Sequence, residues 1–388
     1  MHPLPLTTPA GHAALLAAHQ LGEVDPLAAA SRLRGQGIDP ELASAALTQV
    51  ALRRRAVGKF GPDAERLLFT RAGLEQATRP VVAARRAQRL WGAGVRTLID
   101  LGCGLGADAM ACARAGIRVT AIEADAETAA VTGANVATLG LDSLIDVRHG
   151  DATAADLDGY DAAFCDPARR SGGRRVFDPA AYSPPWDFVV GLAGRVPITV
   201  LKLAPGIDPA LLPHGAELEL VSVDGEVVEA AAWCGPLATV PRRATVIRGT
   251  IAHQLTGGGL AEAPVAKPGA FITDPDGAVV RSHLVAEFAQ AHGGWIGDPT
   301  IAYVWSDEPV SSPFGRCFAV DELLPFSLKR LRTALRDRGV GRVEILKRGS
   351  ALDVEQLRRE LRLAGPTGAS VLLTMVAGRP FAIIANPV

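Results

Sequence analysis

Thr97-Leu98-Ile99-Asp100-Leu101-Gly102-Cys103-Gly104-Leu105-Gly106-Ala107-Asp108 is the stretch that decides the fold. A short apolar run ends in an acid, and three glycines follow at alternate positions before a segment of helical character. Glycine lets the backbone turn sharply, and its missing Cβ lets a ligand approach the main chain. A buried strand that ends in such a loop and opens a helix predicts a ligand-binding turn of an α/β sheet.

Strands and helices alternate around this loop. The strand candidates are Val95–Leu101, Arg118–Ile122, Ile145–Arg148, Ala162–Cys165 and Ile198–Leu203, with helical segments at Ala107–Ala115 and Ala126–Leu139. This rhythm predicts a doubly wound, Rossmann-like α/β fold with a mostly parallel sheet. Glu217–Val223 and Val227–Trp233 flank Asp224-Gly225, a strong signal for an antiparallel hairpin that closes the sheet.

These patterns divide the chain into four expected regions. Residues 1–92 carry leucines at helical spacing and predict an N-terminal helical cap. Residues 93–250 are the Rossmann-like domain. Residues 251–320 begin with a stretch rich in glycine, alanine and proline and are interpreted as a linker and connecting region. Residues 321–388 predict a small α+β domain.

Composition narrows the class of protein. The 388 residues are 48% hydrophobic and 21% charged, which is typical of a globular chain with more than one domain. The sequence contains no run of about 18 apolar residues, so it predicts no membrane span. Its first residues show no signal-peptide pattern, and we therefore expect a cytoplasmic protein. The five cysteines form no C-x-x-C pair and the eight histidines are scattered, so we expect no metal site.

Charge is distributed unevenly although the formal net charge is only −1. Residues 32–89 contain 12 Lys and Arg against 5 Asp and Glu, and residues 321–388 contain 12 against 7. Basic regions on both sides of an acidic centre suit a polyanionic substrate. Solvated helix faces remain the alternative explanation for these arginines.

The glycine loop resembles the first motif of class I methyltransferases, which bind S-adenosylmethionine. Asp100 is poorly suited to a pyrophosphate but well suited to a cationic amino-acid moiety. The resemblance implies that Glu123 binds the ribose hydroxyls and that Asp151 binds the adenine amine. The predicted cofactor-binding residues are Asp100, Gly102, Cys103, Gly104, Gly106, Asp108, Glu123, Ala124, Asp125, Asp151 and Ala152. A tight turn without a ligand is the alternative for the loop, and Asp125 could also cap the helix after it.

A second motif, Asp166-Pro167-Ala168-Arg169-Arg170, follows the fourth strand, where the ligand crevice of a doubly wound sheet lies. Methyltransferases that modify nucleobase amines carry D/N-P-P-aromatic there, and this chain departs from that pattern at its third and fourth positions. The predicted catalytic residues are Asp166 and Pro167, with Asp166 orienting the amine. The predicted substrate-binding residues are Ala168, Arg169, Arg170, Arg174, Arg175 and Lys202. A solvated arginine loop, and a simple pairing of the lysine with Asp166, remain open.

Taken as a whole, the chain resembles bacterial class I S-adenosylmethionine-dependent methyltransferases with a THUMP-like C-terminal domain. Besides the two motifs above, the matching pieces are Leu67-Leu68-Phe69, Leu74-Glu75-Gln76-Ala77 and Lys347-Arg348-Gly349. Because THUMP domains bind RNA, the resemblance implies a methyltransferase that acts on a base in tRNA or rRNA. A small-molecule methyltransferase and an RNA-binding protein with a vestigial cofactor site are the alternatives.

Overall fold

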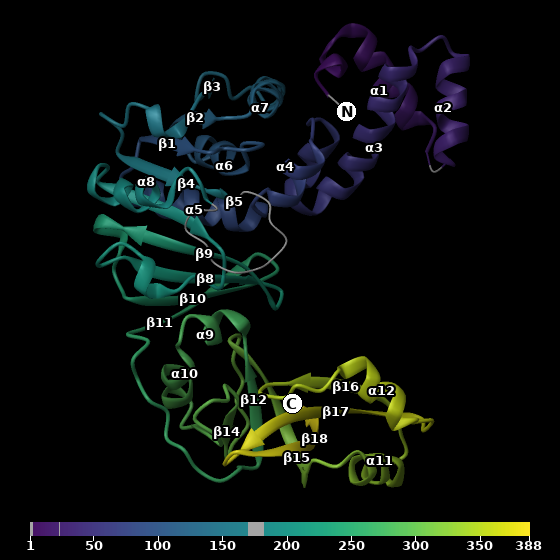
Figure 1. The fold of residues 1–388 in the computed structure, drawn as a ribbon, viewed down its shortest axis with the longest axis vertical. Coiled ribbons are helices and arrows are strands. Elements are labelled where there is room, and N and C mark those ends of the chain that lie inside the picture. Colours follow the sequence, from purple (N-terminus) through teal and green to yellow (C-terminus); the bar gives the residue numbers. More distant parts are fainter. Residues whose placement is uncertain (1–2, 23, 170–181) are drawn as a thin grey trace. The chain divides into compact units, whose positions relative to one another are not determined.

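The computed structural model describes residues 3–22, 24–169 and 182–388 (Figure 1). Its internal contacts divide the chain into two compact units. Unit 1 comprises Met1–Leu203, Asp208–Ala216 and Ala232–Ala238, and unit 2 comprises Ala204–Ile207, Glu217–Ala231 and Thr239–Val388. Within the described residues, no helix has both the length and the apolar character needed to span a bilayer.

Unit 1 begins with helices, as the leucine spacing predicts. They are η1 (Leu4–Thr7), α1 (Pro9–Gln20), α2 (Pro26–Gly35), α3 (Pro40–Phe60), η2 (Gly61–Glu65), α4 (Arg71–Gln76) and α5 (Pro80–Gly92). Four of them, α1, α2, α3 and α5, have proline as their first residue, where the missing N–H costs no hydrogen bond. Thr8, Asp25 and Asp39 cap the first three of these by accepting hydrogen bonds from first-turn amides.

Helices α1 to α4 share a hydrophobic core with the glycine loop and α7 (Ala126–Thr138). The cluster runs from Leu6 through Leu74 and includes Leu105, from the glycine loop, and Val131. Two buried amides clasp the extended chain at Leu68 and Phe69. Gln49 of α3 exchanges two hydrogen bonds with the Phe69 main chain (2.6 and 3.0 Å), and Asn135 exchanges two with the Leu68 main chain (2.7 and 2.9 Å). The Leu67-Leu68-Phe69 motif therefore has a structural role, because its main chain is hydrogen-bonded to both α3 and α7.

The first sheet has nine strands in the order β11-β10-β8-β9-β7-β4-β1-β2-β3. Its strands are β1 (Thr97–Leu101), β2 (Arg118–Glu123), β3 (Ile145–His149), β4 (Ala162–Cys165), β7 (Ile198–Leu203), β8 (Glu217–Val223), β9 (Glu226–Cys234), β10 (Arg242–Arg248) and β11 (Ile251–Gly257). Strands β3, β2, β1, β4 and β7 pair in parallel, so the loops at their carboxyl ends meet along one edge. The Rossmann-like prediction is confirmed.

Helices complete the layers of unit 1. They are α6 (Ala107–Arg114), α7 (Ala126–Thr138) and α8 (Trp186–Gly191), with the short strand pair β5 (Ala168–Arg169) and β6 (Tyr182–Ser183) between β4 and α8. Helix α6 packs against α5, and α7 packs against β2 and β3. Trp186, only 8% exposed, packs against Tyr182 with ring centroids 5.4 Å apart.

The expected turn is present, with φ of 50° at Asp224 and 90° at Gly225. After this hairpin, the structure contains strands where the sequence predicted a linker. Strand β10 pairs in parallel with β8, and β11 pairs antiparallel with β10. Residues 251–257, expected to lie in a linker, are therefore an edge strand. The composition misleads because the glycines and prolines concentrate after Gly257, while the strand itself is held by pairing with β10.

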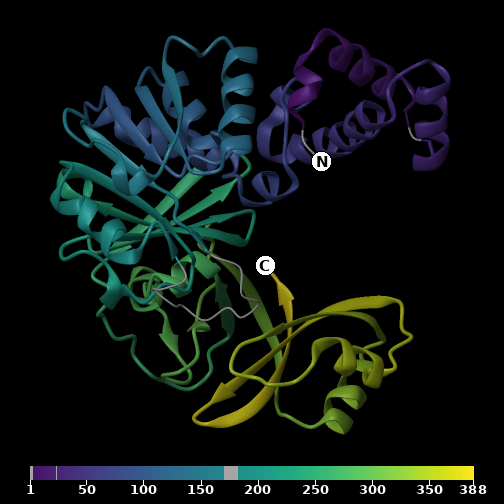
Figure 2. The same cartoon turned by 45° about the horizontal axis from the view of Figure 1, so that its top comes forward.

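Unit 2 also contains a seven-stranded sheet in the order β13-β14-β12-β15-β18-β17-β16. Its elements are β12 (Phe271–Pro275), α9 (Gly277–Arg281), α10 (Val285–Ala291), β13 (Trp295–Ile296), β14 (Val304–Ser306), β15 (Gly315–Pro325), α11 (Leu328–Asp337), β16 (Val340–Lys347), α12 (Val354–Leu361), β17 (Thr367–Val376) and β18 (Arg379–Pro387). Along β17, Val371 and Leu373 pack with α11 and α12, whereas Leu372 packs with Trp305 on the other face. Figure 2 shows the two helices lying together beside this sheet.

Candidate functional site

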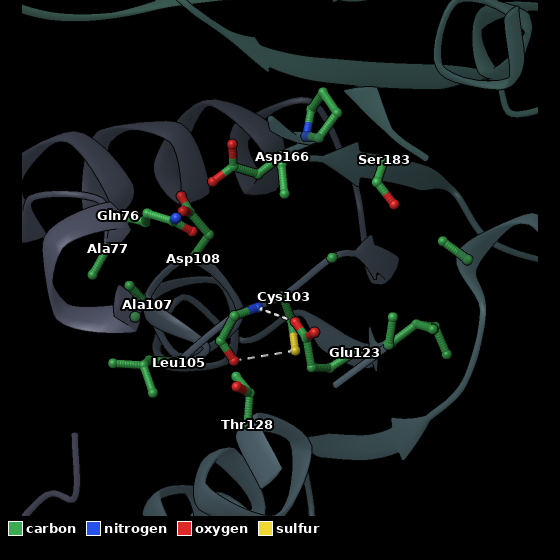
Figure 3. A pocket seen from close by; sticks show the side chains of 18 of the residues that line it. Gln76, Ala77, Cys103, Leu105, Ala107, Asp108, Glu123, Thr128, Asp166 and Ser183 are labelled. Carbon is green, nitrogen blue, oxygen red and sulfur yellow. Dashed lines mark hydrogen bonds between the residues drawn. The ribbon is translucent and has the colours of Figure 1, made fainter. Parts of the chain in front are cut away.

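A cavity of about 510 Å³ lies in unit 1 where the parallel strands end (Figure 3). Its wall combines the glycine loop, the residues that follow β2, β3 and β4, the end of β7, and the segment from Thr70 to Thr78. A volume of this size is typical of a pocket for a small ligand or cofactor.

The glycine loop forms the floor of this cavity. Gly102, Gly104 and Gly106 all have positive φ, of 87°, 54° and 77°. A Cβ on Gly106 would lie 2.9 Å from Cγ2 of Thr132, so glycine is required there by both conformation and space. Thr132 also donates a hydrogen bond from its hydroxyl to the Gly104 carbonyl (2.6 Å), which holds the loop against α7.

Asp100 lies beneath this loop and is not part of the cavity wall. Its side chain is 1% exposed, and neither carboxylate oxygen has a hydrogen-bond partner among the described residues. Burial, and the nearby charges of Asp108 and Asp166, raise the pKa of Asp100 well above its usual range. A buried carboxylate without partners costs free energy when it is ionised, so a cation placed nearby would stabilise its charged form.

Arg86 and Asp108 form a buried ion pair at the base of α6. The two side chains are 3% and 9% exposed, and the guanidinium lies 4.7 Å from the centroid of the Phe164 ring. Because Arg86 neutralises Asp108, the carboxylate in the first turn of α6 contributes little net charge. Among the described residues, no side chain caps the N-terminus of this helix.

At the other end of the loop, Glu123 is the last residue of β2 and holds two backbone amides. Its carboxylate accepts hydrogen bonds from Gly104 and Asp125, both at 2.9 Å. Asp125 in turn caps α7, the alternative role that the sequence left open for it, by accepting from the Thr128 amide (2.8 Å). After β3, Asp151 accepts from the Thr153 amide (2.8 Å) and hydroxyl (2.9 Å), and these hydrogen bonds lower its pKa.

Asp166 and Lys202 face each other at the ends of β4 and β7. Lys202 Nζ lies 2.6 Å from Oδ2 of Asp166 and 3.4 Å from the main-chain oxygen of Gln76. Desolvation raises the pKa of Asp166, and the Lys202 ammonium opposes that rise. The pairing that the sequence left open is therefore present, and it places a lysine and an acid together in the cavity wall.

Cys103 lies in the same wall as Glu123. Burial and the charges of Asp100 and Glu123 raise the pKa of its thiol well above the usual range, so the thiol stays protonated. This agrees with its interpretation as a small loop residue and not a nucleophile.

The structure brings most of the predicted site residues to this cavity. Those in its wall are Gly102, Cys103, Gly104, Asp108, Glu123, Ala124, Asp151, Ala152, Asp166, Pro167, Ala168 and Lys202. Three predicted residues lie outside the wall: Asp100 is buried under the loop, Gly106 is the residue at which the loop turns into α6, and Asp125 is the exposed N-cap of α7. Arg170, Arg174 and Arg175 lie outside the described residues, as does the side chain of Arg169.

Sequence reasoning missed the contribution of the N-terminal helices. The wall also contains Thr70, Ala72, Gly73, Gln76, Ala77 and Thr78, which we call the α4 wall. The Leu74-Glu75-Gln76-Ala77 motif was the available signal, because it is one of the pieces on which the family resemblance depends. Small residues here permit close approach, since a Cβ on Gly73 would lie 2.7 Å from Cγ of Leu105 in the glycine loop.

Replacing Gly73 by alanine is expected to destabilise unit 1 by about 1–3 kcal/mol, because the added methyl group overpacks the contact with buried Leu105. The displaced loop should also bind its ligand several-fold more weakly. Urea unfolding and calorimetric titration measure the two effects. Gly58→Ala in α3, where no atom lies within 4 Å of the new Cβ, is the matched control and should be neutral or stabilising.

The parallel sheet, the glycine loop at its carboxyl edge and the cavity beside it define a Rossmann-like α/β domain with a pocket for a small ligand. The chain is 37% identical over 339 residues to uncharacterized S-adenosylmethionine-dependent methyltransferases from two strains of Mycobacterium tuberculosis, covering 84% of this chain and 90% of each relative. It belongs to this family of S-adenosylmethionine-dependent methyltransferases.

Two family models and one solved structure add to this. Residues 315–387 match the THUMP domain-like family, which confirms the expected C-terminal resemblance, and residues 4–56 match a domain of unknown function. The crystal structure of a proposed methyltransferase from Porphyromonas gingivalis W83 shares the fold with a TM-score of 0.74 at 24% identity, covering 90% of this chain and 92% of that one.

Proposed function

We propose that the protein transfers the methyl group of S-adenosylmethionine to a base in RNA. The acceptor is argued from the pairing of an Asp-Pro loop at the methyl-transfer cavity with a THUMP-like domain in the same chain. The cofactor site is argued from the loop: glycines with positive φ, the uncapped start of α6, and Asp100 with both oxygens unpaired.

Within this cavity, the two ends of the glycine loop suit different parts of the cofactor. Glu123 ends β2, where a carboxylate binds ribose hydroxyls. Asp151 follows β3 and is assigned to the adenine amine. Asp100, beneath the loop, supplies a negative charge for the ammonium and sulfonium groups. The other residues assigned to the cofactor are Gly102, Cys103, Gly104, Gly106, Asp108, Ala124, Asp125 and Ala152.

Asp166 and Pro167 are the residues we assign to methyl transfer. S-adenosylmethionine supplies the methyl group on a sulfonium, a leaving group that requires no acid. The protein therefore has to align the acceptor and exclude water. Asp166 accepts a hydrogen bond from the acceptor amine and takes its proton, and Lys202 positions the carboxylate. Ala168, Arg169, Arg170, Arg174 and Arg175, which follow in sequence, are assigned to the substrate.

The basic helices of the THUMP-like domain support an RNA acceptor. Helix α11 carries Lys329, Arg330, Arg332 and Arg336 against the single acid Asp337. Lys329 and Arg330, together with Arg359 of α12, are exposed and form no ion pair with any carboxylate in the described part of the chain. Unpaired cations on a surface release counterions when they neutralise phosphates.

Replacing Lys329, Arg330 and Arg359 together by glutamine is expected to weaken RNA binding about tenfold or more at low salt. The slope of log K against log salt should fall by about 2, since each lost phosphate contact contributes about 0.7. Filter binding of labelled RNA at several salt concentrations measures both quantities.

A control variant removes the same net charge from side chains that are already held by acids. Arg148, Arg316 and Arg338 pair with Asp146, Glu344 and Glu322, at 2.6, 2.7 and 2.7 Å. Their replacement by glutamine should change the salt slope less. Equal slopes in the two triple variants would argue against the helical surface as the RNA contact.

The experiment that tests the proposed function is transfer of tritiated methyl groups from S-adenosylmethionine into total RNA and, separately, into a small-molecule extract. Label in RNA supports the proposal and leaves the modified base to be mapped. Label confined to small molecules contradicts it while leaving the methyltransferase intact.

A further inference from the structure

The α4 wall has no role in the function described so far, yet it is firmly held. Lys59 Nζ donates hydrogen bonds to the carbonyls of Leu74 (2.8 Å) and Glu75 (2.7 Å). Lys202 Nζ lies 3.4 Å from the next carbonyl, that of Gln76. Two ammonium groups thus hold three successive carbonyls at the C-terminal end of α4, which fixes the turn that follows.

Thr78 lies in this turn and is the polar group without an evident purpose. Its residue surface is 5% exposed, and its hydroxyl has no hydrogen-bond partner among the described residues. Burying a hydroxyl without a partner costs free energy, and such groups in folded proteins call for an explanation. A ligand in the adjoining cavity would supply the missing partner.

The position of Thr78 shows which part of a ligand it would meet. Thr78 and Ala107 both line the main cavity and also a smaller cavity of about 160 Å³ behind it. Ala107 is the first residue of α6, whose initial amides have no side-chain cap. Arg86 neutralises Asp108 in the first turn of α6. The groups near Thr78 at this end of the cavity are therefore backbone amides, which are hydrogen-bond donors at the positive end of the helix dipole.

We infer that Thr78 binds the carboxylate of the amino-acid end of S-adenosylmethionine, together with the first amides of α6. The inference rests on the cofactor placement proposed above, in which Glu123 binds the ribose. Figure 3 shows Ala77, Ala107 and Asp108 toward one end of the cavity and Glu123 toward the other. The carboxylate is the only anionic group of the cofactor, and it lies at the end opposite the adenosine.

The test compares two ligands that differ only in that carboxylate. S-adenosylmethionine and decarboxylated S-adenosylmethionine are titrated calorimetrically into the wild-type protein and into Thr78→Val, which keeps the shape and removes the hydroxyl. Thr78→Val is expected to weaken S-adenosylmethionine about tenfold, the effect of losing one hydrogen bond to a charged group. Its affinity for the decarboxylated ligand should stay within about twofold of the wild-type value, because the hydroxyl and that ligand do not interact and the effects of non-interacting changes simply add within about this margin.

Two further variants keep the test decisive. Thr78→Ser retains the hydroxyl and should preserve the preference for the carboxylate. Thr128→Val removes a hydroxyl from the same cavity wall, where it bonds to Asp125 (2.7 Å), and should change both affinities alike. Equal weakening of the two ligands by Thr78→Val, or weakening of neither, overturns the inference. Because no acceptor is present, the result is independent of whether RNA is methylated, and a wild-type protein that binds neither ligand would overturn the cofactor placement itself.

Discussion

Replacing Asp166 by asparagine is expected to lower the rate of methyl transfer about a thousandfold, within the range attributed to a positioned general base. Asparagine keeps the size of the side chain but cannot take the amine proton. Affinity for S-adenosylmethionine should change by no more than about threefold, because in the proposed site Asp166 serves the acceptor. Single-turnover transfer into RNA and calorimetric titration of the cofactor separate the two effects.

The pH dependence of Asp166 provides a second readout. Burial raises its pKa above the usual carboxyl range, so the base becomes competent only as the pH rises through that raised value. The rate of the wild-type protein should climb over this acidic limb, and Asp166→Asn should lack it. Asp187→Asn, an exposed residue of α8, is the control and should leave rate and limb unchanged. Equal loss of cofactor binding and rate in Asp166→Asn would assign the residue to the cofactor instead.

Asp100→Asn is expected to weaken S-adenosylmethionine about a hundredfold and yet to make the free protein more stable. A charge about 6 Å from a cation contributes about 2.8 kcal/mol at an effective dielectric constant of about 20. In the free protein the same carboxylate is buried, and neither oxygen has a partner in the part of the chain that the structure describes. Removing it should raise the melting temperature by about 2–4 °C, the shift that 1 kcal/mol produces in a domain of this size.

The sign of this stability effect depends on pH. Because the folded-state pKa of Asp100 is raised, ionisation opposes folding as the pH rises above the ordinary value of about 3.9. The gain in Asp100→Asn should therefore be present at neutral pH and vanish in acid below that value. Melting temperatures at several pH values measure it. A melting temperature at pH 7 equal to or below that of the wild type would contradict the account.

Asp161→Asn supplies the matched comparison, since its effects should be the reverse. The Asp161 carboxylate accepts hydrogen bonds from the amides of Arg96 (2.8 Å) and Thr97 (2.9 Å), and these bonds lower its pKa. Its replacement should lower the stability of the free protein and leave the affinity for S-adenosylmethionine unchanged. Comparing the two variants thus distinguishes an acid that contributes to ligand binding, Asp100, from one that stabilises the folded protein, Asp161.

The parallel sheet and about half of the cavity wall could be predicted from local patterns. The loop from Gly102 to Gly106, the acid that ends β2 and the acid that follows β3 lie at the carboxyl edge because parallel strands bring their ends together. Lys202 could be predicted as a site residue in the same way, because it is the last polar residue of its strand. Its pairing with Asp166 was one of the two roles that the sequence left open.

The parts that escaped prediction depend on contacts between distant segments. Nothing local marks Thr78 or Gly73 as cavity residues, because the glycine loop they approach lies about 30 positions later in the chain. Strand β11 exists through its pairing with β10, which no short pattern reveals. Whether Asp100 points into the cavity or beneath the loop depends on the packing around β1, and hydropathy does not distinguish the two.

The hydrophobic core that joins the N-terminal helices to Leu105 and Val131 has a consequence for how the protein responds to its cofactor. Because they share this core, we expect the helices and the glycine loop to unfold together, so that a ligand held by the loop also protects helices that it never touches. At a hundredfold excess over its dissociation constant, a ligand adds about 2.7 kcal/mol to the unfolding free energy of everything coupled to its site. Proteolytic cleavage in α1–α3 should thus report the occupancy of the cofactor site, and a chain shortened at residue 92 would lose much of the core that supports the loop.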